Sequence, residues 1–190
     1  MNDYEQSQSF GGVIDVLEAV GATYAIWGGL AVLAYGEARF TQDMDILLSP
    51  RGFRVAPFVQ RLRESHYHVD EIAVNRSMMG GFFNVIHLYY QIKTDFYVPQ
   101  DSILKTMIAE RVYQPFDQIR KAAYVTATSL VIAKLRAFEH SQSTRHLEDI
   151  ASVIRIQGNN LDEEKIKLAA AQLGLIRNWQ DLWKKNLGDT

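Results

Sequence analysis

The chain has 190 residues, which is long enough for one domain with a hydrophobic core, or for such a domain plus a helical extension. Of these residues 47% are hydrophobic and 22% are charged, a composition typical of globular proteins. It contains no cysteine, which excludes disulfides and thiolate metal sites and fits a reducing compartment. The net charge is −2, and the first 100 residues carry 7 Lys and Arg against 11 Asp and Glu, which argues against a protein that coats nucleic acid.

The chain begins with the acidic and polar segment MNDYEQSQSF, which lacks the charged-then-apolar pattern of a secretory signal. No apolar run approaches the ~18 to 20 residues that a membrane span needs. We therefore expect a cytoplasmic protein with no membrane partner.

Helix and strand patterns alternate through the first hundred residues. In the first helical segment, the apolar residues Val13, Leu17 and Val20 recur at the spacing of a helix. Helices are predicted at residues 9–21, 30–36 and 53–65. Strands are predicted at residues 23–27, 44–48, 66–74, 83–91 and 93–98.

Helical patterns dominate from Asp101 onward, with one short strand-like piece at residues 122–127. The helices are predicted at residues 102–112, 129–141, 144–157, 161–174 and 176–187. This change of pattern predicts an α/β (α+β) core over residues 1–100 and a mostly helical C-terminal region over residues 101–190.

Two acidic residues, Asp43 and Asp45, lie in and beside the apolar segment MDILL. Residues i and i+2 of a strand point to the same face, so both carboxylates project at one place. Two negative charges at such a short separation repel each other, and burial raises the free-energy cost of keeping both ionised. A hard divalent cation such as Mg²⁺ stabilises such a pair and shares its remaining positions with water and phosphates.

Two further features complete this pattern. Gly28 and Gly29 lie where a strand turns into a helix, and a glycine turn of this kind lets backbone N–H groups approach a phosphate. Asp95 lies in a third apolar segment, KTDFYV, where a lone acid is costly. A third carboxylate would complete a two-metal site of the type used in phosphoryl chemistry.

The order Gly-Gly, a spacer of about a dozen residues, Asp-x-Asp on a strand and a later strand Asp resembles the DNA polymerase β-type nucleotidyltransferase superfamily. The segment GEARFTQDMDILL is similar to its bacterial branch of small nucleotidyltransferases, which includes the AbiEii-like abortive-infection toxins. The segment TSLVIAKLRAFEHSQSTRHLEDI resembles the lysine helix and the following helix of that branch.

The resemblance implies a mixed sheet flanked by helices and the transfer of a nucleoside monophosphate from an NTP, with Mg²⁺ or Mn²⁺. Its motifs assign residues to three roles. Metal binding and catalysis fall to Asp43, Asp45 and Asp95, with Asp95 as the base toward the acceptor hydroxyl. Nucleotide binding falls to Gly28, Gly29, Arg39, Lys134 and Asp149. In two places the sequence departs from the pattern: Gly29 replaces a frequent serine, and His146 replaces a frequent acid.

Simpler interpretations stay open for several of these residues. Arg39 either contacts a phosphate or pairs with Asp43 or Asp45. Lys134 could extend its long stem from an apolar helix toward the surface. Asp149 could form an i,i+4 ion pair with Arg145.

Two other groups suggest sites of different kinds. The residues His66, His68 and Asp70 would share one face of a strand, as zinc ligands or as a polar surface. Trp179 and Trp183 are four apart on the last predicted helix, as a packing stripe or as a face that binds a partner.

The leading hypothesis is therefore a nucleotidyltransferase whose acceptor is an RNA, a protein or a small molecule. A toxin paired with an antitoxin protein is one setting for it. A metal-dependent glycosyltransferase also uses Asp-x-Asp but needs a longer domain before the acids. The remaining alternative is a non-catalytic module that keeps the fold and binds a nucleotide or a partner.

Overall fold

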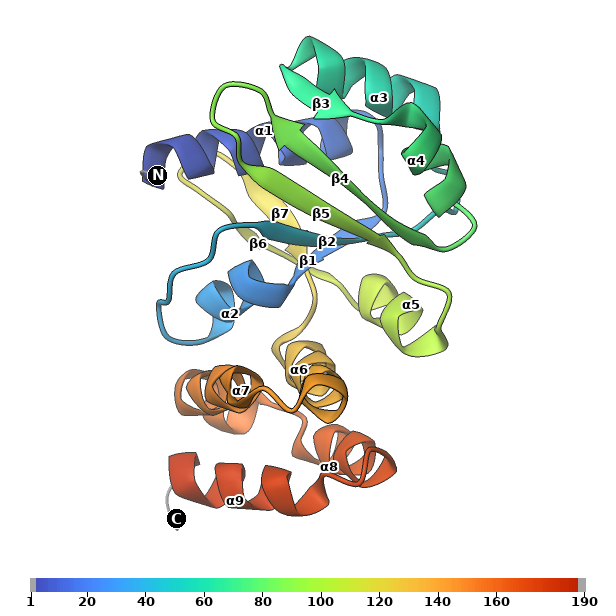
Figure 1. The fold of residues 1–190 in the computed structure, drawn as a ribbon. Coiled ribbons are helices and arrows are strands. Elements are labelled where there is room, and N and C mark those ends of the chain that lie inside the picture. The colour runs from blue at the N-terminus through green and yellow to red at the C-terminus, as the bar shows by residue number, and fades with distance from the viewer. Residues whose placement is uncertain (1–2, 188–190) are drawn as a thin grey trace. The chain divides into compact units, whose positions relative to one another are not determined.

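Figure 1 shows the computed structural model, which describes residues 3–187. It divides into two compact units. The first comprises the residues up to Leu30 together with Thr41–Val125, and the second comprises Ala31–Phe40 together with the residues from Thr126 onward. No helix in the described part of the chain is both long and apolar enough to cross a membrane.

The first unit is built on a mixed sheet that, within residues 3–187, has seven strands in the order β3-β4-β5-β2-β1-β7-β6. The strands are β1 (Tyr24–Trp27), β2 (Met44–Leu48), β3 (Tyr67–Val69), β4 (Gly81–His87), β5 (Lys93–Val98), β6 (Val112–Pro115) and β7 (Lys121–Tyr124). β2 runs antiparallel to β1 and parallel to β5. The helices that accompany them are α1 (Asp3–Ala19), α3 (Val55–Glu64), α4 (Glu71–Ser77) and α5 (Ser102–Ala109).

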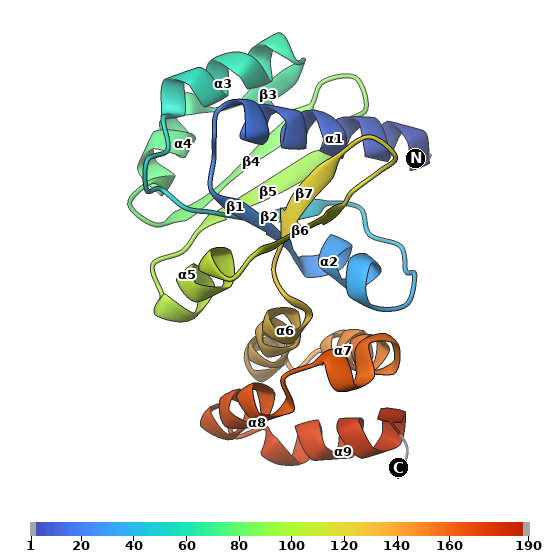
Figure 2. The same ribbon diagram turned by 180° about the vertical axis from the view of Figure 1, so that it is seen from behind.

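One face of this sheet forms the hydrophobic core. Phe58 of α3 meets the rings of Phe83 and Phe96 at centroid distances of 6.2 and 5.7 Å. In Figures 1 and 2, α1 lies on the same side of the sheet as α3, and α5 lies on the other side. Side chains alternate along a strand, so the residues next to Phe96 in β5 point to the face opposite α3.

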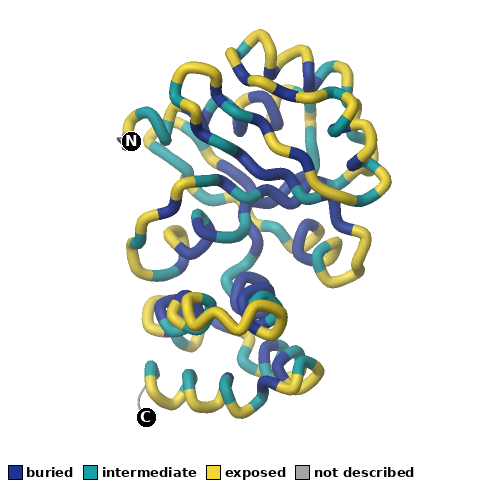
Figure 3. Tube along the Cα trace, in the orientation of Figure 1, coloured by how far each residue is buried: buried dark blue, intermediate teal, exposed yellow. Residues whose placement is uncertain are grey.

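The central strands are apolar because both of their faces are largely covered. Figure 3 shows the buried segments following β1, β2 and β5 through the middle of the first unit. In β2 (MDILL), Asp45 is the residue that is only half-buried, and the four apolar residues around it are fully buried. An acid at this place therefore lies at the edge of the core, not on an open surface.

The second unit is helical. It contains α6 (Ala127–Ser141), α7 (Thr144–Gln157), the short 3-10 helix η1 (Gly158–Asn160), α8 (Glu163–Gln172) and α9 (Ile176–Leu187), and α2 (Gly28–Tyr35) contributes its later residues. Thr126 caps α6 by accepting a hydrogen bond from the backbone N–H of Ser129 (3.1 Å). Trp179 is fully buried and its ring lies 5.1 Å from that of Trp183, which confirms the packing interpretation for Trp179.

Three observations differ from the elements expected from the sequence. The strand predicted at residues 66–74 is wrong beyond Val69, because Asp70 caps α4 by accepting hydrogen bonds from the N–H groups of Ile72 and Ala73. The strand β6 has no counterpart among the expected elements. Because β6 and β7 belong to the sheet, the first unit extends to Val125, past the expected boundary at residue 100.

Candidate active site

The three candidate carboxylates lie on two neighbouring strands of the first unit. Asp45 in β2 and Asp95 in β5 are register partners in the parallel pair, and Asp43 is the residue just before β2. Asp95 is next to Phe96, which packs under α3, so the side chain of Asp95 points to the opposite face. The alternation in β2 places Asp43 and Asp45 on that same face, and the structure therefore brings the three acids together.

Gly28 lies directly against Asp45. Gly28 is the first residue of α2 and has a φ of 64°, a left-handed conformation that glycine adopts without strain. A Cβ atom built on it would lie 2.1 Å from Asp45 Oδ2 and 2.8 Å from Asp45 Cγ. No side chain fits into this space. The turn that opens α2 and the carboxylate of Asp45 therefore form one close-packed unit.

Asp95 is the most deeply buried of the three acids. Only 5% of the residue is exposed, and its Oδ1 atom is buried without a hydrogen-bond partner among the described residues. Its other oxygen, Oδ2, accepts a hydrogen bond from Lys93 Nζ at 2.5 Å. The same ammonium group lies 3.7 Å from Asp43 Oδ2. Lys93 thus places one positive charge between two of the three carboxylates.

The charges around this cluster shift the ionisation of its neighbours. The hydrogen bond to Asp95 raises the pKa of Lys93, and partial burial opposes that change. Burial, together with the nearby carboxylates of Asp45, Asp95 and Asp43, raises the pKa of Tyr97 to about 12. The ring of Tyr97 meets that of Trp27 edge to face at 5.2 Å, so aromatic side chains border the acids. The three acids outnumber Lys93 at this place, so the local charge favours a further cation.

The donor set fits a hard divalent cation. Carboxylate oxygens are the ligands that Mg²⁺ and Mn²⁺ prefer, and an orphaned buried oxygen such as Asp95 Oδ1 requires a partner. As the side chains lie in this structure, no three His, Cys, Asp or Glu residues within residues 3–187 converge enough to hold an ion. Lys93 supplies a positive charge in the middle of the acids instead.

The predicted nucleotide-binding residues of the second unit form a separate, buried ion cluster. Asp149 is 3% exposed, and its carboxylate pairs with Arg39 Nε at 2.7 Å and with Lys134 Nζ at 2.7 Å. Arg39 Nη2 adds a hydrogen bond to the second oxygen at 3.1 Å. The proposed pairing of Asp149 with Arg145 is therefore wrong, and Arg39 pairs with Asp149 instead of with Asp43 or Asp45.

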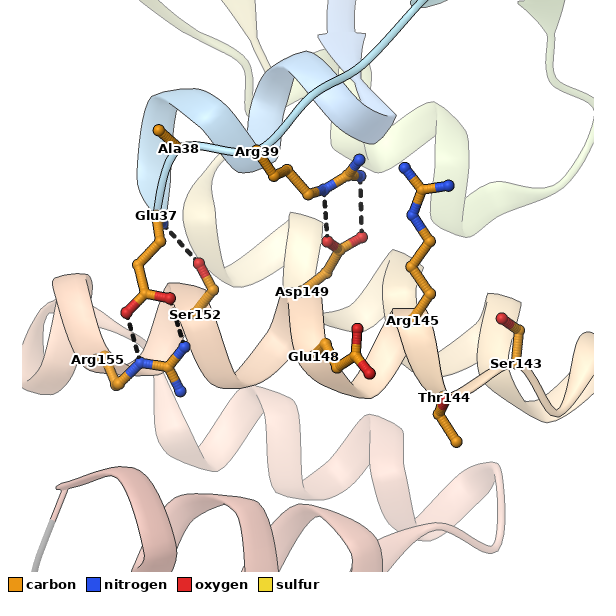
Figure 4. A pocket seen from close by; sticks show the side chains of 10 residues that line it. All are labelled: Glu37, Ala38, Arg39, Ser143, Thr144, Arg145, Glu148, Asp149, Ser152 and Arg155. Carbon is orange, nitrogen blue, oxygen red and sulfur yellow. Dashed lines mark hydrogen bonds and ion pairs between the residues drawn. The ribbon is translucent and has the colours of Figure 1, made fainter.

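A pocket of about 420 Å³ opens beside this cluster in the second unit. Figure 4 shows its lining: Glu37, Ala38 and Arg39 from the segment after α2, Ser143 just before α7, and six residues of α7. Glu37 is fixed by Arg155, whose guanidinium donates two hydrogen bonds to its carboxylate at 2.7 and 2.6 Å. The pocket is therefore lined by charged side chains that pair with one another, and Arg145 adds a further positive charge to its lining.

His146, which replaces a frequent acid, lies near the same cluster. Burial lowers its pKa, and the positive charge of Lys134 lowers it further. A neutral imidazole at this position cannot replace the charge of a carboxylate.

The structure also tests the other groups that the sequence suggested. The zinc interpretation of His66, His68 and Asp70 fails because Asp70 is committed to capping α4 and the ring of His66 packs against Tyr89 at 5.1 Å. Lys93 was missed at the sequence level. Its spacing of two residues from Asp95 in the predicted strand was the signal that both side chains share a face.

No protein-family model and no curated protein matches the sequence. Among solved structures, a solution structure of the antibiotic-resistance factor ANT(2'')-Ia superposes with a TM-score of 0.57 at 12% identity, over 95% of this chain and 97% of that chain. A crystal structure of ANT(2'')-Ia in complex with adenylyl-2''-tobramycin gives a TM-score of 0.56 at 14% identity, over 89% of this chain and 97% of that chain. These likenesses confirm the expected fold, a mixed sheet flanked by helices and followed by a helical C-terminal region.

Proposed function

We propose that this protein is a metal-dependent nucleotidyltransferase that transfers a nucleoside monophosphate from an NTP to an acceptor hydroxyl. One observation carries the proposal: Asp43, Asp45 and Asp95 lie on one face of the sheet, on two neighbouring strands, and Gly28 packs directly against Asp45. Three acids on adjacent strands are costly unless a cation neutralises them. Their arrangement on this fold supports catalysis more than a non-catalytic binding role.

Asp43, Asp45 and Asp95 would hold the divalent cation, Mg²⁺ or Mn²⁺. When bound, the cation neutralises the carboxylates and polarises phosphate oxygens. Gly28 and Gly29 would direct backbone N–H groups at the start of α2 toward the triphosphate, and the absent side chain at position 28 allows that approach.

Asp95 would accept the proton of the acceptor hydroxyl. The acceptor oxygen then forms a bond to the α-phosphorus, the bond from the α-phosphorus to the bridging oxygen breaks, and pyrophosphate leaves.

The ion cluster would contribute to nucleotide binding through Arg39, Lys134 and Asp149. Asp149 is shared between the two cations, so it fixes their positions. The outer nitrogen of the Arg39 guanidinium, Nη1, donates a hydrogen bond to the exposed backbone carbonyl of Phe40 at 3.2 Å. Arg39 is 24% exposed, against 3% for Asp149. The contact to nucleotide is therefore assigned to Arg39, and the other two residues position it.

For the acceptor we propose a small molecule first, because ANT(2'')-Ia, which shares the fold, was solved with adenylyl-2''-tobramycin. The similarity of residues 36–48 to abortive-infection toxins supports an RNA or protein acceptor and an antitoxin partner as the competing setting. Both settings use a cellular NTP, which agrees with a cytoplasmic location.

The experiment that tests this proposal incubates the protein with each of the four α-labelled NTPs and Mg²⁺ or Mn²⁺. Separate reactions contain tobramycin, a mixture of bacterial small molecules, total bacterial RNA and total bacterial protein. The double variant Asp43→Ala/Asp45→Ala is the matched inactive control. The proposal expects label in one acceptor fraction with the wild-type protein and none with the variant.

The fraction that carries the label identifies the acceptor class. Label on RNA or protein, together with growth arrest on expression that the double variant relieves, would support the toxin setting. Nucleotide binding without transfer in every fraction would favour the non-catalytic module. Transfer that persists in the double variant would refute the assignment of the acids.

A further inference from the structure

Lys93 is the one group in the acidic cluster that the proposed reaction does not use. It lies two residues before Asp95 in β5, and both side chains point to the face that carries the acids. Its ammonium group lies 2.5 Å from Asp95 Oδ2 and 3.7 Å from Asp43 Oδ2. A positive charge is thus already present where the carboxylates would hold a divalent cation.

The two partners of Lys93 differ in their environment. The Asp95 side chain is 7% exposed, whereas those of Asp43 and Lys93 are 41% and 40% exposed. The contact with Asp95 is therefore the stronger one, because it is shorter and the Asp95 carboxylate is poorly screened by water. Because 40% of the Lys93 side chain is exposed, the ammonium group has a path out of the cluster.

We propose that Lys93 is an internal counter-ion that neutralises the acidic cluster while no divalent cation is bound and must be displaced when the cation binds. This inference rests on the proposed function, since it concerns the same carboxylates. Lys93 is a positioning residue: it touches the groups that bind the cation and acts through them.

The displacement makes cation binding depend on the nucleotide. A free cation has to expel a tethered ammonium from Asp95 and leave that charge without a partner. A cation that arrives with a triphosphate brings phosphate oxygens that can pair with the released ammonium. The protein should therefore bind free cation weakly and the cation–nucleotide complex well.

The test measures Mn²⁺ binding by the loss of the free-ion paramagnetic resonance signal, with and without α,β-methylene ATP, which is not cleaved. In Lys93→Met, which keeps the length of the side chain and removes its charge, free Mn²⁺ should bind about tenfold more tightly than in the wild type, as expected for the loss of one competing charge near 4 Å. The gain in affinity that the nucleotide analogue produces should shrink by a similar factor.

Two further variants separate charge from structure. Lys93→Arg retains the positive charge and should keep the weak binding of free Mn²⁺. Lys121→Met removes an exposed lysine at the start of β7 and serves as the matched control for a change in net charge. It should bind Mn²⁺ as the wild type does.

Thermal unfolding provides a readout that does not depend on resonance. Without metal, Lys93→Met should have a lower Tm than the wild type, because Asp95 is left buried without a counter-ion. Mn²⁺ should raise the Tm of this variant more than that of the wild type. An equal rise in the two proteins would contradict the displacement.

The outcomes distinguish this inference from the proposed function. If the wild type binds Mn²⁺ with the analogue but Lys93→Met binds free Mn²⁺ no more tightly, the counter-ion role is refuted and the enzyme assignment stands. If neither protein binds Mn²⁺ under any condition, both are refuted. Tighter binding in Lys93→Met, reversed in Lys93→Arg, would establish the role.

Discussion

Replacing Gly28 with alanine isolates the contact between the turn of α2 and the acidic cluster. At a φ of 64°, an L-residue costs roughly 1–2 kcal/mol. The new Cβ would also lie 2.1 Å from Asp45 Oδ2, a separation that no real contact allows. The Asp45 carboxylate must move by about 1 Å or more to admit this methyl group, and misplacing a catalytic group by that distance can cost on the order of 10²-fold in rate.

Gly21 provides the matched control. Its φ is also 64°, but a Cβ atom there meets nothing within 4 Å. Gly21→Ala should therefore pay the same backbone cost, lowering the Tm by about 2 to 8 °C for a chain of this size, without any effect on the acids. Gly28→Ala should lose a similar amount of stability and, in addition, most of its activity.

The assay compares urea unfolding, followed by circular dichroism, with the rate of nucleotidyl transfer for the two variants. The account predicts similar free energies of unfolding and a difference of about 10²-fold in rate. Equal rates in Gly21→Ala and Gly28→Ala would refute the close approach of Gly28 to a catalytic Asp45. A much larger stability loss in Gly28→Ala would show that Asp45 cannot rotate.

Two other predictions concern buried charge. Asp149→Asn should lower the free energy of unfolding by about 3–5 kcal/mol, because Arg39 and Lys134 would face a neutral amide in a buried site. Urea unfolding measures this loss, and a loss below ~1 kcal/mol would contradict the stabilising role of the ion cluster. The pKa of Tyr97 is raised from 10.0 to about 12 by burial and by acids that include Asp95, so its contribution to stability is complete below pH 10 and is lost as the pH rises through 12. The ultraviolet titration of the wild type minus that of Tyr97→Phe should show one phenol with a midpoint near 12, and a midpoint at 10 would overturn this placement.

Local patterns in the sequence were sufficient to predict the parts of the site that lie within one element. Asp43 and Asp45 are two residues apart, so their shared face follows from the period of a strand. The glycine turn before them and the lone acid in KTDFYV are equally local signals. These features identified the three acids one by one, and the resemblance to the nucleotidyltransferase superfamily supplied the mixed sheet and the expectation that the acids act together.

Contacts between distant parts of the chain could not be predicted in this way. Asp45 and Asp95 become neighbours only because β2 pairs with β5, and nothing in either segment specifies that partner. Arg39 and Asp149 are separated by 110 positions, and the only protein partners that the sequence suggested for either residue lay closer along the chain. The pairing order of strands and the packing of helices decide such contacts.

The errors in secondary structure have a similar origin. Alternating burial in residues 66–70 is typical of a strand, but the carboxylate of Asp70 satisfies the first N–H groups of α4 and begins a helix there. The strand β6 is mostly exposed and owes its conformation to pairing with β7. An exposed strand of this kind carries no hydrophobic period of its own.

In the proposed reaction, the bond between the α-phosphorus and the oxygen that bridges to the β-phosphorus breaks, and the nucleoside monophosphate passes to the acceptor. The most direct measurement incubates the wild type and Asp95→Asn with Mg²⁺, the bacterial acceptor fractions and NTPs labelled at either the α- or the γ-phosphate, and follows where each label appears. The account predicts α-label on the acceptor and γ-label in pyrophosphate for the wild type, and neither product for Asp95→Asn. γ-Label on the acceptor, or α-label transfer by Asp95→Asn at the wild-type rate, would contradict it.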